Sequence, residues 1–307
     1  MQRKDRIDSF GAAILIAQSA VLGLNQVMIK LVNVGLQPVF QAGLRSLCAI
    51  LPILLFAIVT RKKLSLRDGT LGPGILTGLF FTAEFTLLFQ ALDYTTVSRA
   101  SIFFYTMPFW VALGAHSLIP GERLTSLRIL GLFLAFAGVV LALSGNEAPA
   151  TANAFIGDIM CLIAAAFWAA LTLCLRTTKL AQTSPEMQLL YHLVVSAIVL
   201  LAIAPLFGDL IRAPTVGIVA IFGVQVLLVV FVGFLAWFWI LSIYPASSVA
   251  SFSFLAPVFG VFFGWLVLGE TITWRIAGAL VLVGVGLVLV NRRTGPQPAG
   301  LEEKRSG

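Results

Sequence analysis

Apolar residues run along this chain in long segments that short polar turns separate. Each segment has roughly the 20 residues that an α-helix needs to cross the hydrocarbon core of a bilayer. Turn signals such as Arg61-Lys62-Lys63 and Thr183-Ser184-Pro185 mark the boundaries between neighbouring segments. The pattern predicts ten membrane-spanning helices, at residues 11–33, 37–60, 70–92, 97–119, 127–145, 154–176, 186–207, 214–241, 247–268 and 273–291.

The composition excludes a soluble protein. Of the 307 residues, 59% are hydrophobic and 11% are charged, whereas about 25% of the residues in an ordinary soluble domain are charged. The loops and tails are too short to form a separate soluble domain, and the polar tail at 294–307 is predicted to be disordered. We therefore expect an all-α integral membrane protein.

The net charge of +7 indicates membrane orientation rather than nucleic-acid binding, because the basic residues flank apolar segments. Two basic residues, Arg212 and Arg275, lie in connections on the side opposite the N-terminus. The basic residues on the N-terminal side are Arg3, Lys4, Arg6, Arg61, Lys62, Lys63, Arg67, Arg123, Arg128, Arg176, Lys179, Arg292, Arg293, Lys304 and Arg305. The positive-inside rule therefore places both termini in the cytoplasm, with the spans in the plasma (inner) membrane.

The two halves of the chain are similar to each other. Matching residues occur in the same order in both halves: Gly11 with Gly157, Pro38 with Pro185, Arg45 with His192, Leu92 with Leu241, Ser98 with Ser247, Pro108 with Pro257, Gly121-Glu122 with Gly269-Glu270, Arg128 with Arg275 and Gly131 with Gly278. Each half contains five spans, and an odd number makes the second half enter the membrane from the opposite side. We predict two inverted five-helix repeats, at 1–147 and 148–293, an arrangement typical of transporters that bind their substrate near the membrane midplane.

Each repeat carries a Pro, then Gly-Glu, then Arg and Gly at the start of its last helix, and this arrangement resembles the EamA branch of the drug/metabolite transporter superfamily. The resemblance covers residues 10–291. It implies a secondary transporter that exports small organic metabolites, with amino acids, aromatic or hydrophobic ones among them, as the first candidates. Nucleosides, vitamins and cationic drugs are the alternative cargo. The family frequently has a Trp where this chain has Leu22, so the two halves of the site differ.

Three ionisable residues inside the spans are candidates for coupling or gating. Glu84 lies about eight residues, or roughly 12 Å, from the end of its span. A charge at that depth costs at least ~2.5–3.5 kcal/mol, so it should face protein or water. Glu84 can bind a substrate ammonium group, carry a coupling proton, or pair with Arg45, which lies at a similar depth. His192 occupies the repeat position of Arg45, and its titration range suits proton coupling, although a packing role is commoner.

The first span carries a polar strip. Gln18 and Asn25 are seven residues apart, as are Ser19 and Gln26, so all four lie near one helix face. Buried amide groups in lipid need partners, so this face is expected to point toward other helices or water. The strip either joins helices through hydrogen bonds or lines the transport path, and Asn25 is our candidate for substrate contact.

Aromatic residues and two helix bends complete the predicted site. Trp168 lies in the middle of its span, away from the interfacial belt where Trp usually occurs. With Tyr105 and its repeat counterpart Phe254, it is a candidate wall of a central cavity. Pro108 and Pro257 lie near the centres of their spans, where each removes a backbone hydrogen bond and bends the helix. Such a cavity suits zwitterionic or apolar metabolites, and ring faces also attract an ammonium group.

The sequence does not support an enzyme. It contains no His-Glu-x-x-His motif, no paired aspartates within a span and no Ser/His/Asp set at one depth. The three cysteines show no ligand-like spacing, so we expect no catalytic residues, no metal and no cofactor. A membrane-embedded enzyme and a receptor are the remaining alternatives. The expected partners are a small-molecule substrate, the lipid bilayer and, as a candidate coupling ion, the proton; the chain is expected to be a monomer or a homodimer.

Overall fold

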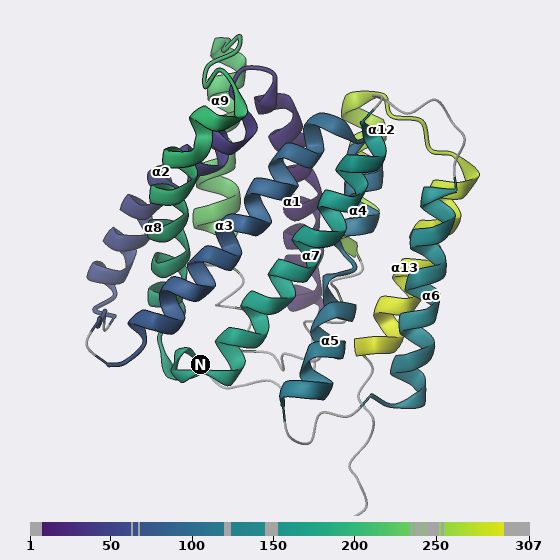
Figure 1. Ribbon diagram of the computed structural model, residues 1–307, viewed down its shortest axis with the longest axis horizontal. Helices are drawn as coiled ribbons and strands as arrows, with labels where there is room; N and C mark the ends of the chain where they lie inside the picture. The colour runs from purple at the N-terminus through teal and green to yellow at the C-terminus, as the bar shows by residue number, and fades with distance from the viewer. Residues whose placement is uncertain are drawn as a thin grey trace, which may run out of the picture.

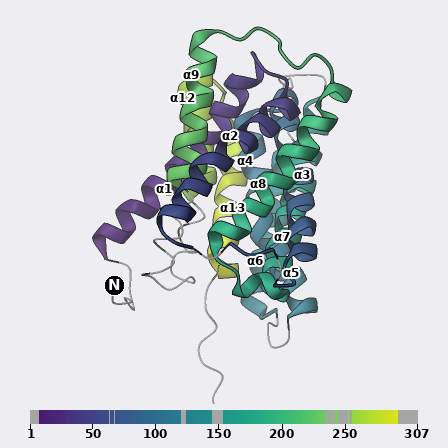
Figure 2. The ribbon, with the colours of Figure 1, turned by 90° about the vertical axis from the view of Figure 1, so that its left-hand side faces the viewer.

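The computed structural model describes residues 8–62, 64–66, 68–119, 124–144, 153–233, 236, 240, 243, 252 and 255–291. In this part of the chain the regular structure is helical, apart from one isolated bridge between Leu36 and Ile211. The helices stand side by side as a bundle (Figure 1), and a view from the side shows the same alignment (Figure 2).

The described helices of the first repeat are α1 (Ser9–Asn33), α2 (Pro38–Val59), α3 (Leu71–Tyr94), α4 (Val97–Phe104), α5 (Met107–Leu118) and α6 (Ser126–Leu143). Side chains cap the starts of α1, α2, α4 and α6. The Asp8 side chain accepts a hydrogen bond from the Gly11 N–H, and Thr125 accepts one from the Arg128 N–H. These caps satisfy N–H groups that have no partner inside the helix.

The second repeat begins with α7 (Ala154–Thr177), the short 3₁₀ helix η1 (Lys179–Gln182), α8 (Pro185–Ile203) and η2 (Ala204–Phe207). It continues with α9 (Val216–Val224), the π-helix η3 (Gln225–Gly233), α12 (Leu255–Leu268) and α13 (Trp274–Asn291). The predicted eighth span therefore changes its helix type at Gln225. The predicted tail at 294–307 and the turns at 121–123 and 145–147 lie outside the described residues.

The lengths and hydropathies of these helices fit an integral membrane protein. Among the described residues, seven helices are long and apolar enough to cross a membrane, and α12 and α13 are shorter apolar helices. The predicted span at 97–119 is present as two consecutive helices, α4 and α5, which meet at residues 105–106. Together these elements account for the ten predicted spans, so the all-α membrane fold is confirmed.

The first helices of the two repeats, α1 and α7, run in opposite directions. The end of α1 lies beside the end of α3, because Asn33 Nδ2 donates a hydrogen bond to Phe89 O at 3.0 Å. The start of α7 lies at the same end of α3, where a Cβ atom added to Gly157 would be 3.0 Å from Ala91 O. The second repeat is therefore inverted relative to the first, as predicted.

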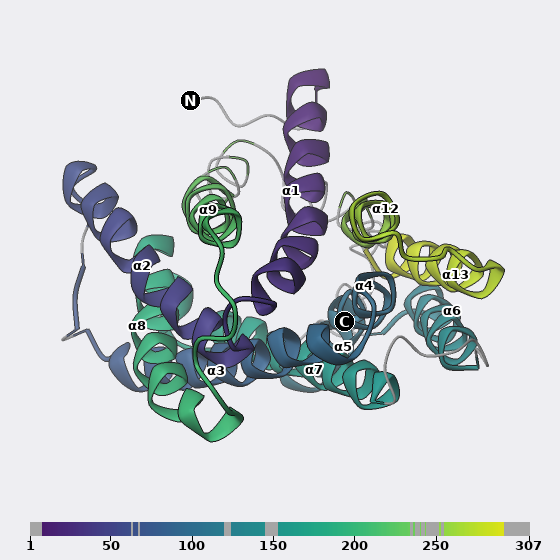
Figure 3. The ribbon, with the colours of Figure 1, turned by 90° about the horizontal axis from the view of Figure 1, so that it is seen from above.

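The two repeats are interleaved rather than separate. The main helix pairs are α1 with α12, α2 with α8, α3 with α7 and α6 with α13, and each joins one helix of each repeat. Seen from above, α2, α8, α3 and α7 form a continuous row, with α1, α9 and α12 on one side of it (Figure 3). We call the end of the bundle where α1 ends and α4 begins the α4 end; it is uppermost in Figure 1.

Candidate functional site

Three helices bring the predicted ionisable residues into one region of the bundle. Arg45 lies on α2, Glu84 on α3 and His192 on α8, and all three side chains are buried. Helix α3 packs against both α2 and α8. At 1.5 Å per residue, Arg45 is about 10 Å from the start of α2 and Glu84 about 15 Å from the end of α3. Both therefore lie well inside a hydrocarbon core of about 30 Å.

Aromatic rings of α3 hold Arg45 and His192. Phe81, Phe85 and Phe89 follow one another at four-residue spacing, so they line one face of the helix. The Arg45 guanidinium carbon lies 4.5 Å from the centre of the Phe85 ring and 4.7 Å from that of the Phe89 ring. The His192 ring is stacked on Phe81, with centroids 5.3 Å apart. A guanidinium over an aromatic face gains about 2 kcal/mol when it is desolvated, so these rings stabilise the buried cation.

Arg45 and Glu84 interact electrostatically across this region. In the part of the chain that the structure describes, however, no ion pair joins them, and neither Glu84 oxygen has a hydrogen-bond partner. The two side chains are neighbours without being in contact in this conformation. A gate that closes by joining Arg45 to Glu84 therefore stays a prediction.

A chain of amide groups leads from α1 to the same region. Gln225 Nε2 donates to Asn25 Oδ1 at 3.2 Å, and Gln41 Nε2 donates to Gln225 Oε1 at 3.4 Å. Gln41 lies one helical turn before Arg45, so the two share a face of α2. These groups come from both repeats, and the meeting of repeats is where transporters of this design bind substrate. We call the whole set the polar belt: Asn25, Gln41, Arg45, Glu84, His192 and Gln225.

Several buried atoms of the polar belt have no hydrogen-bond partner among the described residues: Gln41 Oε1, both carboxyl oxygens of Glu84 and His192 Nε2. Buried polar atoms are nearly always paired in folded proteins, so each exception calls for a reason such as a role in binding or proton transfer. Leaving such a group unpaired costs about 1–3 kcal/mol. The concentration of these atoms in one place makes the polar belt the candidate site.

The rest of the polar strip on α1 makes contacts between helices. Ser101 Oγ on α4 donates to Gln26 Oε1 at 2.6 Å, and Gln18 Nε2 donates to Gly233 O at 3.2 Å. The hydroxyl of Ser19 donates to Leu15 O within α1 at 2.9 Å. The strip therefore points toward other helices, as expected, and Asn25 is the member that joins the polar belt.

The predicted aromatic wall and bends lie on other helices. Tyr105 is buried where α4 ends, and Pro108 follows in the first turn of α5, where its missing N–H leaves no helical hydrogen bond unmade. Pro257 is buried near the start of α12, and Trp168 is half-buried in the middle of α7. Among the described residues, no hydrogen bond or ring contact joins Tyr105 or Trp168 to the polar belt, and Phe254 lies outside those residues. Their roles in a cavity stay predictions.

Sequence reasoning gave no site role to four polar residues that the structure places in contacts between the two repeats. Gln41 and Gln225 belong to the polar belt, and Asp158 and Glu270 bind the start of α4. Asp158 had a detectable signal, because it is an acidic residue inside an apolar span, as Glu84 is. Glu270 was visible as part of the repeated Gly-Glu pair, but its partner depends on how the repeats pack.

A comparison with models of known protein families shows which family the chain belongs to. A model of the EamA-like transporter family matches the chain twice, over residues 9–144 and 155–292. The chain belongs to this family. Membership of the EamA-like family, together with the apolar helices, makes the protein an integral membrane transporter with a small-molecule substrate.

Similar proteins from bacteria carry transporter names. The uncharacterized transporter YoaV of Bacillus subtilis (strain 168) is 25% identical over 286 residues, which cover 90% of this chain and 94% of that protein. A probable amino-acid metabolite efflux pump of Salmonella typhimurium (strain LT2) is 29% identical over 301 residues, covering 92% and 94%. Its namesake in Escherichia coli (strain K12) is 29% identical over 299 residues, covering 94% and 95%.

A solved crystal structure has the same fold as this EamA-like chain. It superposes with a TM-score of 0.63 at 17% identity, and the match covers 92% of this chain and 95% of the other. At this identity the likeness concerns the fold alone. It agrees with the helix order described above.

Proposed function

We propose that this EamA-like transporter exports amino acids, with aromatic and hydrophobic ones as the first candidates, by alternating access around the polar belt. The observation that carries the proposal is the buried carboxyl of Glu84, which lies near Arg45 but has no partner for either oxygen. Glu84 and Arg45 supply one acid and one base within the polar belt, and such a pair complements a zwitterion. The names of the two efflux pumps among the relatives agree with this substrate class.

The proposed roles follow from charge. Arg45 pairs with the substrate carboxylate, and Glu84 accepts hydrogen bonds from the ammonium group, which are among the stronger contacts that a protein makes. Opposite charges that enter together neutralise each other, and this lowers the cost of placing each one in a dry interior. Asn25 contacts the substrate from α1, and His192 takes part in coupling or gating.

The apolar part of the substrate is proposed to contact aromatic residues. Tyr105 and Trp168 supply ring faces from α4 and α7, and Phe254 supplies a third. Pro108 and Pro257 shape the helices around this space. Aromatic side chains bury large areas and favour edge or offset stacking, which suits aromatic and aliphatic side chains of a substrate.

We further propose that Glu84 carries a proton when no substrate is bound. A carboxyl group without hydrogen-bond donors in an apolar interior is tolerated as the neutral acid, because an isolated ionised carboxylate is far more costly to bury. The Glu84 oxygens then bind either a proton or the ammonium group of the substrate, but not both. Because Glu84 holds only one of the two at a time, the entry of a proton is coupled to the exit of the substrate.

We infer that both termini are cytoplasmic and that the repeats extend over 1–147 and 148–293. This orientation places the α4 end outside the cytoplasm, because Arg212 and Arg275 are the two basic residues that the sequence assigns to the connections on that side, against fifteen on the side of the N-terminus. A monomer and a homodimer both fit this topology. Asp209 is an exposed residue between η2 and α9, and Asp209→Cys would be labelled by an impermeant maleimide in intact cells only in this orientation.

Counterflow in proteoliposomes tests the function. Vesicles containing the purified protein are preloaded with one amino acid and then given trace amounts of its labelled form, with and without a pH gradient. We expect substrate-selective uptake that Trp168→Ala abolishes. Glu84→Gln should abolish the effect of the pH gradient and lower uptake at least about tenfold, which corresponds to about 1.4 kcal/mol. Glu186→Gln is the matched control, because Glu186 is a buried glutamate of α8 outside the polar belt.

The alternatives give different results in the same assay. Folded protein that shows no counterflow for any amino acid would contradict the proposed substrate class, and nucleosides, vitamins and cationic drugs would be tested next. Release of a chemically altered product would indicate a membrane-embedded enzyme. Binding without flux would indicate a receptor. An unchanged pH dependence in Glu84→Gln would remove proton coupling from Glu84 alone.

A further inference from the structure

A carboxylate of the second repeat caps the first helical turn of α4. Glu270 lies in the turn between α12 and α13, and its Oε1 accepts a hydrogen bond from the Val97 N–H at 2.6 Å. Its Oε2 accepts two more, from the Ser98 N–H at 2.8 Å and from Ser98 Oγ at 2.7 Å. The first N–H groups of a helix have no partner within it, and the helix dipole favours an anion there. Glu270 therefore stabilises the start of α4 from the other repeat.

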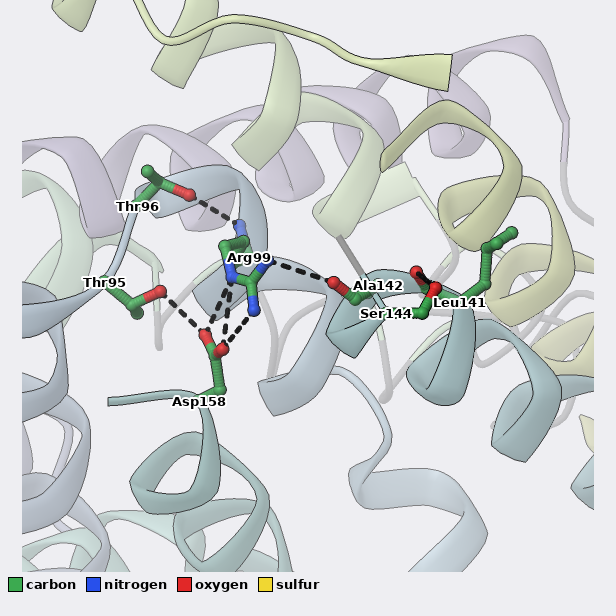
Figure 4. A network of polar contacts seen from close by, with 7 residues as sticks. All are labelled: Thr95, Thr96, Arg99, Leu141, Ala142, Ser144 and Asp158. Carbon is green, nitrogen blue, oxygen red and sulfur yellow. Dashed lines mark hydrogen bonds and ion pairs between the residues drawn. The ribbon is translucent and has the colours of Figure 1, made fainter. Parts of the chain in front are cut away.

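A second carboxylate of the second repeat holds the same segment (Figure 4). Asp158 on α7 accepts from Arg99 Nε, at 3.2 Å to Oδ1 and 3.1 Å to Oδ2, and it is also paired with Arg99 Nη2. Thr95 Oγ1 donates to Asp158 Oδ1 at 2.7 Å, and Arg99 Nη1 donates to Ala142 O on α6 at 3.0 Å. The Asp158 side chain is 0% exposed. A bidentate guanidinium–carboxylate pair of this kind fixes orientation as well as charge.

Two glycines leave room for these contacts. A Cβ atom added to Gly264 would lie 2.7 Å from Glu270 Oε2, and one added to Gly157 would lie 3.0 Å from Thr95 Cβ. The backbones of α12 and α7 therefore approach the start of α4 as closely as these carboxylates require. Residues 95–99 are held from two sides.

All these contacts lie at the α4 end of the bundle. Two further links close the same end: Lys30 Nζ donates to Thr95 O, and Arg212 Nη1 pairs with Asp93 Oδ2 at 2.8 Å. Arg45 and Glu84 lie about 10–15 Å deeper along their helices. The start of α4 therefore lies nearer to the α4 end of the bundle than Arg45 and Glu84 do.

The ion pair has no equivalent in the other half of the sequence. With the repeat offsets found above, the counterparts of Arg99 and Asp158 are Ser248 and Ala12, and these residue types cannot form an ion pair. Glu270 has a sequence counterpart in the first repeat, Glu122, whereas the Arg99–Asp158 pair has no counterpart in the other half. The two halves of the sequence therefore differ in this pair.

We propose that Glu270 and Asp158 form a latch that closes the transport path at the α4 end, and that residues 95–99 leave both carboxylates each time the path opens there. This inference rests on the proposed alternating access. Inverted repeats switch access by rocking against each other around a central site, and both latch contacts cross from one repeat to the other. Glu270 and Asp158 are positioning residues, because they act through α4 and not on the substrate.

The test measures access to a cysteine beneath the latch. Ser101 lies one turn further along α4 than Ser98 and is 0% exposed. In full-length protein with Cys48, Cys161 and Cys174 replaced by Ala, Ser101→Cys is labelled with an impermeant maleimide from either side of the membrane. We expect Glu270→Gln and Asp158→Asn each to raise the labelling rate from the α4 end at least about tenfold, a shift of about 1.4 kcal/mol in the opening equilibrium. Labelling from the opposite end should not rise.

Three further variants separate a latch from a general loss of stability. Glu186→Gln changes a glutamate paired with Lys62 at the opposite end and should leave the rate at the α4 end unchanged. Gly264→Ala displaces the Glu270 carboxylate without removing it and should act in the same direction as Glu270→Gln. Arg99→Gln combined with Asp158→Asn should raise the rate by less than the product of the two single effects, because the two residues share one contact.

Two results would overturn the latch. One is a labelling rate at the α4 end that is the same in Glu270→Gln, Asp158→Asn, Gly264→Ala and the control; the other is an equal rise from both ends. Labelling needs no substrate, so its outcome is separate from that of counterflow. A rise confined to the α4 end, with no amino acid transported, would keep the latch and reject the substrate class.

Discussion

Replacing Gly260 by Ala tests whether α1, α4 and α12 approach as closely as the structure places them. A Cβ atom added to Gly260 would lie 2.0 Å from Ser101 Oγ and 2.9 Å from Ser101 Cβ. The Ser101 hydroxyl donates to Gln26 Oε1 at 2.6 Å, and both side chains are buried, so Ser101 cannot turn away without losing that bond. On α1, a Cβ atom at Gly23 would lie 2.6 Å from Gly260 N.

The expected loss can be worked out from these contacts. Overpacking a tightly filled site costs about 1–3 kcal/mol, and the hydrogen bond between Ser101 and Gln26 is worth about 0.6 kcal/mol in a membrane protein. Against this, Gly→Ala in a helix gains up to about 1 kcal/mol of helix propensity. Gly284→Ala on α13 should show that gain alone, because nothing lies within 4 Å of its added Cβ atom. Because the gain in helix propensity is common to both variants, they should differ by about 1.6–3.6 kcal/mol.

The assay is reversible unfolding of the purified variants in mixed micelles, followed by the change in helix content. Gly260→Ala should unfold more easily than Gly284→Ala by the stated amount. Adding Ser101→Ala to Gly260→Ala removes the closest clash and should restore at least about 1 kcal/mol, although Ser101→Ala alone should cost about 0.6 kcal/mol. Equal stability of the two alanine variants, within about 0.5 kcal/mol, would refute the close packing of these helices.

Three further predictions concern charged groups. The free energy of unfolding of Glu84→Leu should stay within about 1 kcal/mol of that of the parent, because an apolar side chain replaces a buried carboxyl without partners. The same variant should stop uptake. A loss of several kcal/mol in stability would show that Glu84 has a structural partner. Lys62→Ala should change stability by less than about 1 kcal/mol, because Lys62 is 44% exposed and contacts Glu186 at 3.4 Å; a larger change in unfolding would contradict this. A hydrogen bond from the Thr70 side chain holds the pKa of Asp68 below its usual 3.8. The contribution of Asp68 to the stability of the folded state is therefore present above that value and is lost as the pH falls through the lowered pKa. The difference in Tm between the parent and Asp68→Asn should shrink on acidification.

The membrane helices could be predicted well because their signal is local. A span needs only enough consecutive apolar residues, and the predicted 11–33 and 37–60 correspond to Ser9–Asn33 and Pro38–Val59. The sequence predicted a bend at Pro108, but it did not predict the break at residues 105–106 or the π-helix Gln225–Gly233. Their sequences are as apolar as their neighbours, so the irregularity depends on packing against other helices.

The candidate site could be predicted only in part. The cost of burying a charge singled out Arg45, Glu84 and His192 one at a time, and the structure places them on three helices that pack together. The partner of Arg45 could not be read from the sequence, and it is a pair of rings, Phe85 and Phe89. Which side chains meet depends on the rotation of each helix about its axis, and an apolar span does not encode that clearly.

The contacts at the α4 end bear on the direction of transport. A substrate can shift an equilibrium between two conformations only by the difference in its affinity for them. In the proposed latch, the conformation held by Glu270 and Asp158 is closed at the α4 end, so we expect substrate to reach the polar belt from the opposite end, which we propose to be the cytoplasmic one. Binding there must then help to release the start of α4. We infer that the latch sets the order of steps that export requires, in which substrate binds from the cytoplasm before the α4 end opens.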